Sequence, residues 1–531
     1  MKKFNTTGLC IPAKHYMVDI SERLDKIKAM VDEGDFFCIN RGRQYGKTTM
    51  LRALTVFLRE DYTVVPLDFQ ALGGALFRNE GVFSQGLSLL ILDVCEDNGI
   101  LLPDRIREAF ERFTEKNSGD VFIYELFQII MHWCMESEKP IVLLIDEVDS
   151  ASNNQVFLDF LAQLRAMYLE RESSDLPAFQ SVILAGVTDV CNIELESSPD
   201  EINRGNSPWN IAADFNIDMS LSEDGIRGML EDYEADHHTG MDTAEMARQL
   251  RSYTSGYPYL VSRLCQLIDG QVSEKKGSLS ATWTLQGLDE AIIILLADGS
   301  DTLFGSLMGK LKNSPTLKTQ LREVLMQGRF ISWQPFNQEQ SLLRMNGFIR
   351  NDHNRVSISN RIFEMALYQH FLGDSDKNDA FSQDAQIHKS IFINDDHTLN
   401  MPLILEHFVQ AQRMIHGDAD EQFLEKEGRE CFLTYLSPII NGTGTYSIEE
   451  QTRDARRMDV VVHYLGQRFV IGLKIWHGQR YHAAGEHQIM DYLDFFSLST
   501  GYLVSFCFKQ KKDPGVKQLS FGDKVLFEAI V

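Results

Sequence analysis

Four consecutive residues, Gly46, Lys47, Thr48 and Thr49, have the types and the order that suit the binding of a nucleoside triphosphate. They follow a short apolar run at 36–39 and open a segment whose apolar residues have helical spacing. In such a unit, backbone N–H groups at the helix N-terminus contact the phosphates, the lysine reaches the β- and γ-phosphates, and the next hydroxyl binds Mg²⁺. We therefore expect ATP to bind at these four residues, with Thr48 as a Mg²⁺ ligand.

The loop before these residues departs from the phosphate-loop pattern G-x-x-x-x-G-K-[ST] at its first position. Arg41 stands where the pattern has glycine, and Gly42 comes one place late. We include Gly42 in the expected nucleotide site. The alternative is a basic turn that only caps the following helix.

Two acidic residues, Asp146 and Glu147, follow a run of five apolar residues at 141–145. A continuous apolar strand suits the centre of a parallel sheet, and ligands of open α/β sheets bind beyond the carboxyl ends of the strands. We expect Asp146 to hold Mg²⁺ through water, and Glu147 to polarise the water that attacks the γ-phosphate. An aspartate at such a strand end can also be a helix cap, but the paired acids favour the catalytic role.

Two further apolar segments, 62–69 and 181–190, are predicted to be strands of the same sheet. Thr188, at the end of the second, is placed either to sense the γ-phosphate or to cap a helix. Arg204 lies in a loop-like segment and is either an arginine finger or a solvated side chain. Arg263 lies in a predicted helix and is either a lid arginine that reaches the nucleotide or a surface residue.

The segments NRGRQYGKT, LLIDEVD, SPWNIAADF and SGYPYLV together resemble the bacterial AAA-ATPase-like family of the STAND/AAA superclass, over residues 10–370. That family's loop commonly lacks the first glycine, which accommodates Arg41. The resemblance implies an ATP-binding αβα core, a helical lid and a winged-helix domain, which we place at 1–220, 221–300 and 301–372.

The third of these regions has its own pattern. Within 321–371, a helix is followed by two short apolar segments around the turn sequence NDHN and by another helix. Because no basic recognition helix is present, we expect this region to relay changes within the protein in preference to binding DNA. The polar, acidic segment that follows predicts a linker at 373–405.

A second set of residues that could do chemistry lies at 406–531, where the pattern is helix, strand, two strands joined by a turn, helix, strand. Cleavage of a phosphodiester with Mg²⁺ requires two or three oxygen ligands around the metal and a cation near the phosphate. We expect Asp459 to be the first metal ligand and Lys474 to be the cation. An acid should stand two residues before the lysine, but Gly472 occupies that position.

This segment resembles the PD-(D/E)XK nuclease superfamily, in the subgroup fused behind AAA-ATPase-like domains. The resemblance is carried by EEQTRDARRMDVVV, by LKIWHG, and by Gln488 and Tyr492, which are four residues apart on one predicted helix face. It implies the pattern E-L-K where this chain has Gly472–Leu473–Lys474.

Two interpretations of the glycine stay open. A neighbouring acid could replace the missing ligand, with Glu449 or Glu450 on the preceding strand and Glu425, Glu427 or Glu430 on the preceding helix as candidates. Alternatively, the domain is a pseudo-nuclease that still binds nucleic acid or a partner. A deliberately inactivated sequence would look the same at this position.

Composition bounds these expectations. The 531 residues predict two to four domains, and 44% hydrophobic with 24% charged residues is ordinary for globular protein. The eight cysteines form no C-x-x-C pair and indicate a reducing compartment, and the absence of a secretory signal and of long apolar runs predicts a cytoplasmic protein without membrane contact. The net charge of −25 disfavours nonspecific nucleic-acid binding by the whole chain. Residues 421–531, however, hold 13 basic and 14 acidic residues, so nucleic acid is more compatible with this segment.

We therefore predict a multidomain α/β protein: a P-loop αβα sandwich with lid and winged helix, then a restriction-endonuclease-like α/β domain. Its predicted function is that of an ATP-binding and ATP-hydrolysing regulator with Mg²⁺, coupled to a nuclease-like domain that binds DNA in preference to RNA. A role in defence or in control of mobile elements is expected from the architecture alone. The alternative is a nucleotide-switched scaffold with an inactive nuclease fold; homo-oligomers are compatible with both.

Overall fold

The computed structural model describes residues 2–531 except 152–153, 175, 188–189, 191–207, 328–330, 336, 374–383, 386, 395–397, 417–424, 441–443, 451–457, 465–466, 476–488, 495–497 and 508–513. The chain forms two compact units. The first contains residues 1–221 with the short segments Tyr257–Tyr259 and Arg344–Gly347, and the second contains the remainder. The domain boundaries predicted from the sequence stay predictions.

A parallel four-stranded sheet forms the centre of the first unit. Its strands in spatial order are β1 (Phe36–Asn40), β4 (Ser181–Gly186), β3 (Ile141–Asp146) and β2 (Thr63–Asp68). The sheet contains both additional strands predicted from the sequence. Because β4 lies between β1 and β3, the phosphate-binding loop and the acidic strand tip come from strands that are not neighbours.

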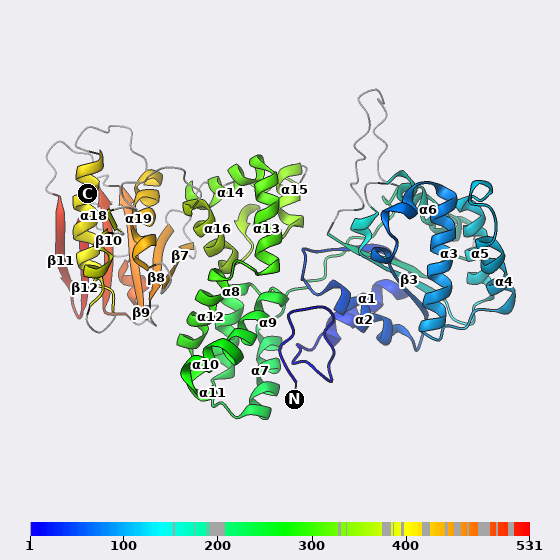
Figure 1. Ribbon diagram of the computed structural model, residues 1–531, viewed down its shortest axis with the longest axis horizontal. Helices are drawn as coiled ribbons and strands as arrows, with labels where there is room; N and C mark the ends of the chain where they lie inside the picture. The colour runs from blue at the N-terminus through cyan, green and yellow to red at the C-terminus, as the bar shows by residue number, and fades with distance from the viewer. Residues whose placement is uncertain are drawn as a thin grey trace, which may run out of the picture. The chain divides into compact units, whose positions relative to one another are not determined.

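Helices cover both faces of this sheet (Figure 1). Successive residues of a strand point to opposite faces, so Phe37 packs with α1 (Ser21–Asp32) and α2 (Lys47–Leu58), whereas Phe36 packs on the other side. The helices of that other layer are α3 (Glu80–Asp97), α4 (Asp104–Thr114), α5 (Ile123–Glu136) and α6 (Gln155–Ser174). This is the predicted αβα sandwich.

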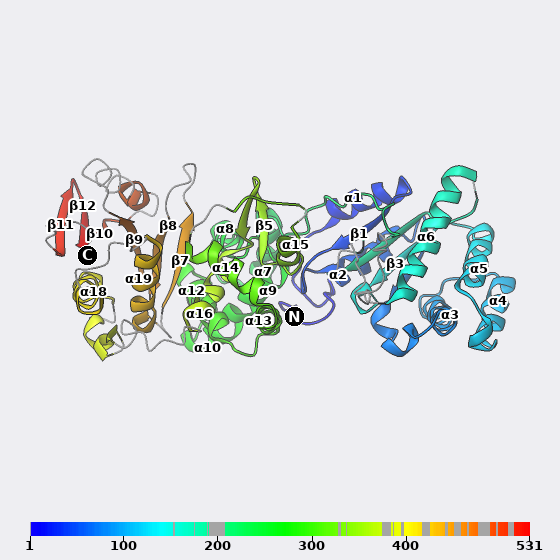
Figure 2. The same ribbon diagram turned by 90° about the horizontal axis from the view of Figure 1, so that it is seen from above.

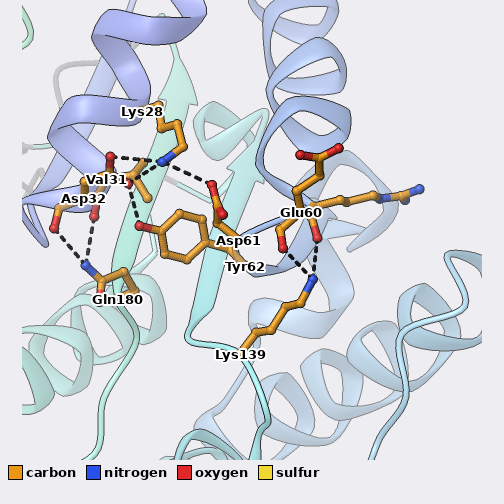
Figure 3. A network of polar contacts seen from close by, with 9 residues as sticks. Lys28, Val31, Asp32, Glu60, Asp61, Tyr62, Lys139 and Gln180 are labelled. Carbon is orange, nitrogen blue, oxygen red and sulfur yellow. Dashed lines mark hydrogen bonds and ion pairs between the residues drawn. The ribbon is translucent and has the colours of Figure 1, made fainter.

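A network of polar contacts surrounds the N-terminal ends of β2 and β3 (Figure 3). Lys28 of α1 forms ion pairs with Asp32 and Asp61, and the Tyr62 hydroxyl donates to Asp32. Lys139, just before β3, donates to the backbone carbonyls of Arg59 and Glu60 at the end of α2. These contacts fix α1, α2 and β3 relative to one another at the N-terminal ends of the strands. Asp68 and Asp146 lie at the opposite, C-terminal ends.

The second unit begins with a helical region. Its elements are α7 (Glu223–His237), α8 (Thr243–Thr254), α9 (Pro258–Leu267), a π-helical turn (Ile268–Val272), α10 (Ser273–Lys276), α11 (Leu279–Thr282) and α12 (Leu285–Ala297). The elements α13 (Thr302–Asn313), α14 (Pro315–Gln327), α15 (Gln338–Met345), β5 (Ile349–Asp352), β6 (Arg355–Ile358) and α16 (Arg361–Gly373) follow. His353 and Asn354, between β5 and β6, both have positive φ, as a two-residue hairpin turn requires. The predicted hairpin is therefore present.

A six-stranded mixed sheet forms the C-terminal part. Its order is β11 (Gly515–Phe521), β12 (Lys524–Ile530), β10 (Thr500–Phe506), β9 (Gln467–Ile475), β8 (Met458–Tyr464) and β7 (Gly444–Glu450). Helices α18 (Met401–His416) and α19 (Glu425–Ile440) pack on one face (Figures 1 and 2). The helical residues 489–494 pack on the other. The order from α19 to β10 is therefore the predicted helix, three strands, helix, strand.

Several described residues of the predicted linker belong to helices. Residues Lys389–Phe392 form a short 3-10 helix, and Phe392 is fully buried. The next helix, α18, already begins at Met401. Within the described residues, the second half of 373–405 is thus packed protein, and the C-terminal helices begin earlier than the sequence pattern suggested.

Among the described residues, no single helix is both long and apolar enough to cross a membrane. One bent helix pair, Leu285–Ala297 with Thr302–Asn313, reaches the required length and composition only when the two helices are taken together.

Candidate nucleotide-binding site

The loop between β1 and α2 has the geometry of an anion site. Gly46 adopts φ +83°, in the left-handed region that favours glycine, and it directly precedes Lys47, the first residue of α2. The helix therefore begins with its free N–H groups at the loop, where the helix dipole also favours negative charge. The positive φ explains why the glycine before the lysine is needed.

Lys47 is almost fully buried, at 7% exposure. Its ammonium group donates to the carbonyls of Arg41 (3.0 Å) and Gly42 (3.1 Å) in the same loop. Burial lowers the pKa of Lys47, and the carboxylates of Glu147, Asp149 and Asp146 oppose that shift. The ammonium is thus held over the loop by weak carbonyl contacts, which a phosphate oxygen would replace with a stronger charge-assisted bond.

Thr48 and Asp146 meet across the sheet. The Thr48 hydroxyl donates to Asp146 Oδ2 at 2.7 Å, although the two residues are 98 positions apart. Asp146 lies at the end of β3, is 8% exposed, and accepts the backbone N–H of Glu147 at its other oxygen. A hydroxyl and a carboxylate at this separation form a set of hard oxygen donors that fits Mg²⁺.

Glu147 is held in an unusual backbone conformation. Its φ is +54°, and a short 3-10 helix follows at Val148–Ser150. Non-glycine residues with such a φ are uncommon and cluster at functional sites. Burial and the neighbouring Asp146 raise the pKa of Glu147, while Lys47 lowers it. A partly buried carboxylate with a raised pKa has the properties of a general base.

Arg41, which occupies the first glycine position of the loop pattern, has a structural role. Its guanidinium group donates to the carbonyl of Ile217 at 3.0 Å and lies 5.6 Å from the centroid of the Phe215 ring. Its backbone N–H donates to the carbonyl of Gly186 at 3.1 Å. The side chain thus joins the loop to the segment that runs beside β1, where Phe37 bridges Ala213.

The two remaining loop residues of the prediction are also placed. A Cβ at Gly42 would lie 3.5 Å from the Tyr257 hydroxyl and 3.7 Å from the carbonyl of Asn346, which is ordinary contact. Gly42 therefore contributes its backbone carbonyl, which accepts from Lys47, and the position has room for a side-chain Cβ. Thr49 accepts the backbone N–H of Cys10 at 3.4 Å, so it anchors the N-terminal segment to α2.

Of the three predicted auxiliary residues, the structure describes one, Arg263. Thr188 and Arg204 lie outside the described residues. Arg263 of α9 belongs to the second unit, where its guanidinium group pairs with Asp298 at 3.0 Å and more distantly with Asp301 at 3.8 Å. These carboxylates lie between α12 and α13, so Arg263 connects α9 to this junction. It is therefore not the solvated surface residue that was the alternative prediction.

The second predicted site lies on the C-terminal sheet. Gly472 pairs with Leu503 of β10, and Lys474, 3% exposed, pairs with Ser505. Glu449 of β7 pairs with Asp459 of β8, and only their backbone is described. Gln488 lies outside the described residues, and Tyr492 packs on the apolar cluster of this sheet.

The register extends these pairs across the sheet. Val460 pairs with Ile471, so the next antiparallel step places Asp459 opposite Gly472. Among the described residues, no three His, Cys, Asp or Glu side chains gather as a metal site. The position opposite Asp459 is therefore held by a glycine, which supplies no side-chain oxygen.

Two residues beside the nucleotide site were not predicted from the sequence. Asp149 accepts the backbone N–H of Val187 at 2.7 Å, and Gly186 ends β4 against Asp149. The signal for Asp149 was its place three residues after Asp146 in the stretch DEVD. Nothing in the sequence alone indicates that this side chain reaches the neighbouring strand.

These features define a P-loop nucleotide-binding protein: a parallel sheet, a loop that opens α2 at Lys47, and an acidic strand tip that contacts Thr48. The chain belongs to the family described as AAA-like domain, whose model matches residues 13–373. It contains a nucleotide-binding, AAA-like ATPase domain. No curated protein matches the sequence.

Solved structures give more distant similarities. A Walker-type ATPase of Pyrococcus abyssi has 13% identity and a TM-score of 0.45, covering 68% of this chain and 99% of that one. The ORC1 protein of Aeropyrum pernix, solved in complex with DNA, has 12% identity and a TM-score of 0.31, covering 66% and 93%. The RuvB Holliday junction branch migration motor of Thermotoga maritima has 12% identity and a TM-score of 0.32, covering 67% and 95%. Similarities this low transfer no function.

Proposed function

We propose that this protein hydrolyses ATP and uses the nucleotide state to control its C-terminal domain. The observation that carries the first half is the 2.7 Å contact between Thr48 and Asp146, which joins the phosphate loop to the acidic strand tip. A structural basic turn would have no need of this contact. Lys47 precedes Thr48 and Glu147 follows Asp146 in the chain, and their opposite charges influence each other.

The roles of the residues follow from their chemistry. The N–H groups at the start of α2 and the Lys47 ammonium bind the phosphates. Thr48 and Asp146 would hold Mg²⁺, which when bound neutralises charge on the β- and γ-phosphates. Glu147 orients the attacking water and takes up its proton, a task for which its raised pKa suits it.

The second half of the proposal is supported by packing within the second unit. The helical region, the hairpin region and the C-terminal sheet form one compact unit. Tyr253 of α8 lies 6.2 Å, ring to ring, from His463 of β8, and α16 packs on β7. Asp289 of α12 is close enough to Arg468 of β9 for that arginine to lower its pKa, although burial raises it to about 6 overall. A change in the helices would therefore reach the sheet directly.

The C-terminal domain is proposed to bind nucleic acid, DNA in preference to RNA, through a nuclease-type fold. The order of its elements and the lysine on β9 support this proposal. Its charge is close to balanced, unlike the rest of the chain. A role in defence or in control of mobile elements fits an ATPase joined to such a domain.

A second candidate function is a nucleotide-switched binder whose nuclease fold is inert. The observation that favours it is the pairing of Gly472 with Leu503, an apolar residue that is fully buried. Neither residue supplies a side-chain oxygen, and a hard cation with Asp459 as its only carboxylate ligand would bind weakly. This candidate predicts nucleic-acid retention without cleavage.

The experiment that tests the proposal measures ATP hydrolysis by the purified full chain with Mg²⁺, in wild type, Lys47→Ala and Glu147→Gln. We expect full turnover in wild type alone, loss of turnover in Lys47→Ala, and a residual rate about a hundredfold lower with nucleotide retained in Glu147→Gln. Equal phosphate release by all three proteins would contradict ATP hydrolysis at this site. Incubation of the same wild-type protein with DNA and Mn²⁺ then separates cutting from retention.

A further inference from the structure

The end of β4 is held from both sides. The carbonyl of Gly186 accepts the N–H of Arg41 at the start of the phosphate loop, at 3.1 Å. The N–H of Val187 donates to the Asp149 carboxylate, in the turn after Asp146, at 2.7 Å. Because β4 lies between β1 and β3, these two bonds connect the phosphate loop to the turn at 147–150, which we call the acidic turn, through the end of β4.

The connection through β4 requires glycine at position 186, because the acidic turn packs closely against it. A Cβ at Gly186 would lie 2.7 Å from Cγ2 of Val148 and 3.2 Å from both carboxylate oxygens of Asp149. Val148 is fully buried and has little room to shift. Glycine at the end of β4 thus allows the acidic turn to approach the strand, and this approach brings the carboxylate within reach of the Val187 N–H.

The charge of the same carboxylate also acts on the reactive groups. Asp149 is among the charges that raise the pKa of Lys47, and it also raises the pKa of Glu147. Among the described residues, the Glu147 side chain has no hydrogen-bond partner. Because Glu147 has a left-handed φ, the position of its side chain depends on the turn that follows. The turn is in part anchored by Ser150, whose hydroxyl donates to the carbonyl of Phe69.

We propose that Asp149 is a positioning residue for ATP hydrolysis: by bonding Val187, it fixes the acidic turn at its correct distance from the phosphate loop. This inference rests on the proposed ATPase function. Phosphate binding depends on the loop itself, so loss of Asp149 leaves nucleotide affinity largely intact. The rate depends on where Glu147 stands relative to the γ-phosphate, so turnover falls.

The test compares Asp149→Ala and Asp149→Asn in the full chain, with kcat from phosphate release and Kd from titration with a fluorescent ATP analogue. We expect Asp149→Ala to lower kcat about tenfold or more, as misplacement of a catalytic group does, with Kd changed less than about threefold. Asparagine keeps an acceptor oxygen for Val187, so Asp149→Asn should recover most of the lost rate. A merely structural residue would change both constants together or lower the melting temperature without this split.

Two further variants complete the experiment. Gly186→Ala removes no charge but pushes the acidic turn away from β4, and it should reproduce the loss of kcat. Asp242→Ala is the matched control, because Asp242 is an exposed aspartate of the second unit that accepts the backbone N–H of Glu245 at 3.0 Å, and it is not among the charges that act on Lys47 or Glu147. It should leave kcat within about twofold, as surface changes away from such features usually do.

The outcomes distinguish the positioning role of Asp149 from ATP hydrolysis by the protein. Wild-type turnover with an unchanged kcat in Asp149→Ala would overturn the positioning role alone. Equal loss in the alanine and asparagine variants would assign the effect to charge and would also overturn it. Absence of turnover in wild type would overturn the ATPase proposal and this inference with it.

Discussion

The two sheets of this protein differ in how completely their polar residues form a site. Beside the N-terminal sheet, Thr48 at the start of α2 donates to Asp146 at the end of β3, and Lys47 donates to carbonyls of the loop before it. On the C-terminal sheet, Lys474 is equally buried, but the position two residues before it is glycine. A buried lysine therefore does not by itself indicate a working site; the oxygen ligands around it do.

The difference also concerns how each site tolerates loss. The nucleotide site is built from backbone groups at the start of α2 and from the hydrogen bond between Thr48 and Asp146, so a single change removes a contact that the site uses. The site proposed on the C-terminal sheet would draw acids from separate strands, and this sheet forms with glycine at position 472. The following predictions test this contrast, from the largest expected effect to the smallest.

Lys47→Ala should give the largest effect. The ammonium would make charge-assisted bonds to phosphate, each worth about 1.5–3 kcal/mol, so nucleotide affinity should fall about a hundredfold or more. Isothermal titration with ATP and Mg²⁺ measures this change. Lys474→Ala serves as the control, because it removes a buried lysine from the other sheet and should leave ATP affinity unchanged. Similar loss in both variants would end the contrast between the two regions.

Glu147→Gln should lower kcat by about a hundredfold, the contribution expected of a general base, with nucleotide retained. The pH dependence has a defined sign. Because burial and Asp146 raise the pKa of Glu147, wild-type kcat should decline on acidification at a higher pH than for an ordinary glutamate, as the carboxylate becomes protonated. The decline should be absent from the residual rate of Glu147→Gln. A wild-type profile whose acidic decline falls at the pH of an ordinary glutamate would contradict the assignment.

Gly472→Glu tests whether the C-terminal sheet lacks only one ligand. A carboxylate opposite Asp459 would supply the second oxygen donor that Mg²⁺ or Mn²⁺ requires. We expect cleavage of a DNA fragment to appear, measured on a gel, and to disappear again in the double variant with Lys474→Ala. Cleavage by wild type at the same rate would show that another acid already completes the site.

Lys139→Ala should have the smallest effect. Lys139 holds two carbonyls at the end of α2, 2.9 Å and 2.7 Å from its ammonium, at the sheet edge away from the nucleotide. Its loss should reduce the free energy of unfolding by about 1 kcal/mol and leave ATP affinity unchanged. Lys116→Ala, which breaks an exposed ion pair with Glu125, should cost about 0.5 kcal/mol or less in the same urea titration. Reduced ATP affinity in Lys139→Ala would show that the site extends across the whole sheet.

Local pattern predicted most of the first sheet. The apolar run before Asp146 and the Gly46–Lys47–Thr48 sequence each report a strand end or a helix start, which neighbouring residues determine. The order of the strands was not accessible in this way, because the insertion of β4 between β1 and β3 depends on packing between segments about 40 residues apart or more.

Residues whose role depends on distant partners were misjudged or missed. The ion pairs of Arg263 with Asp298 and Asp301 were not predicted, and its expected contact with a nucleotide stays a prediction. Asp149 was not singled out, since its partner Val187 is 38 positions away. At the C-terminal sheet, the sequence predicted the elements and the missing acid, and the register added that the neighbour of Gly472 is apolar.

Arg41 has a consequence for how the phosphate loop can move. Its side chain is bonded to Ile217, only a few positions before the chain passes from the first unit to the second at residue 222. A loop with glycine at this position could widen around a ligand on its own. Here the same widening must either break the bond to Ile217 or draw that stretch of backbone along, so a local adjustment to phosphate becomes a pull on the connection between the two units.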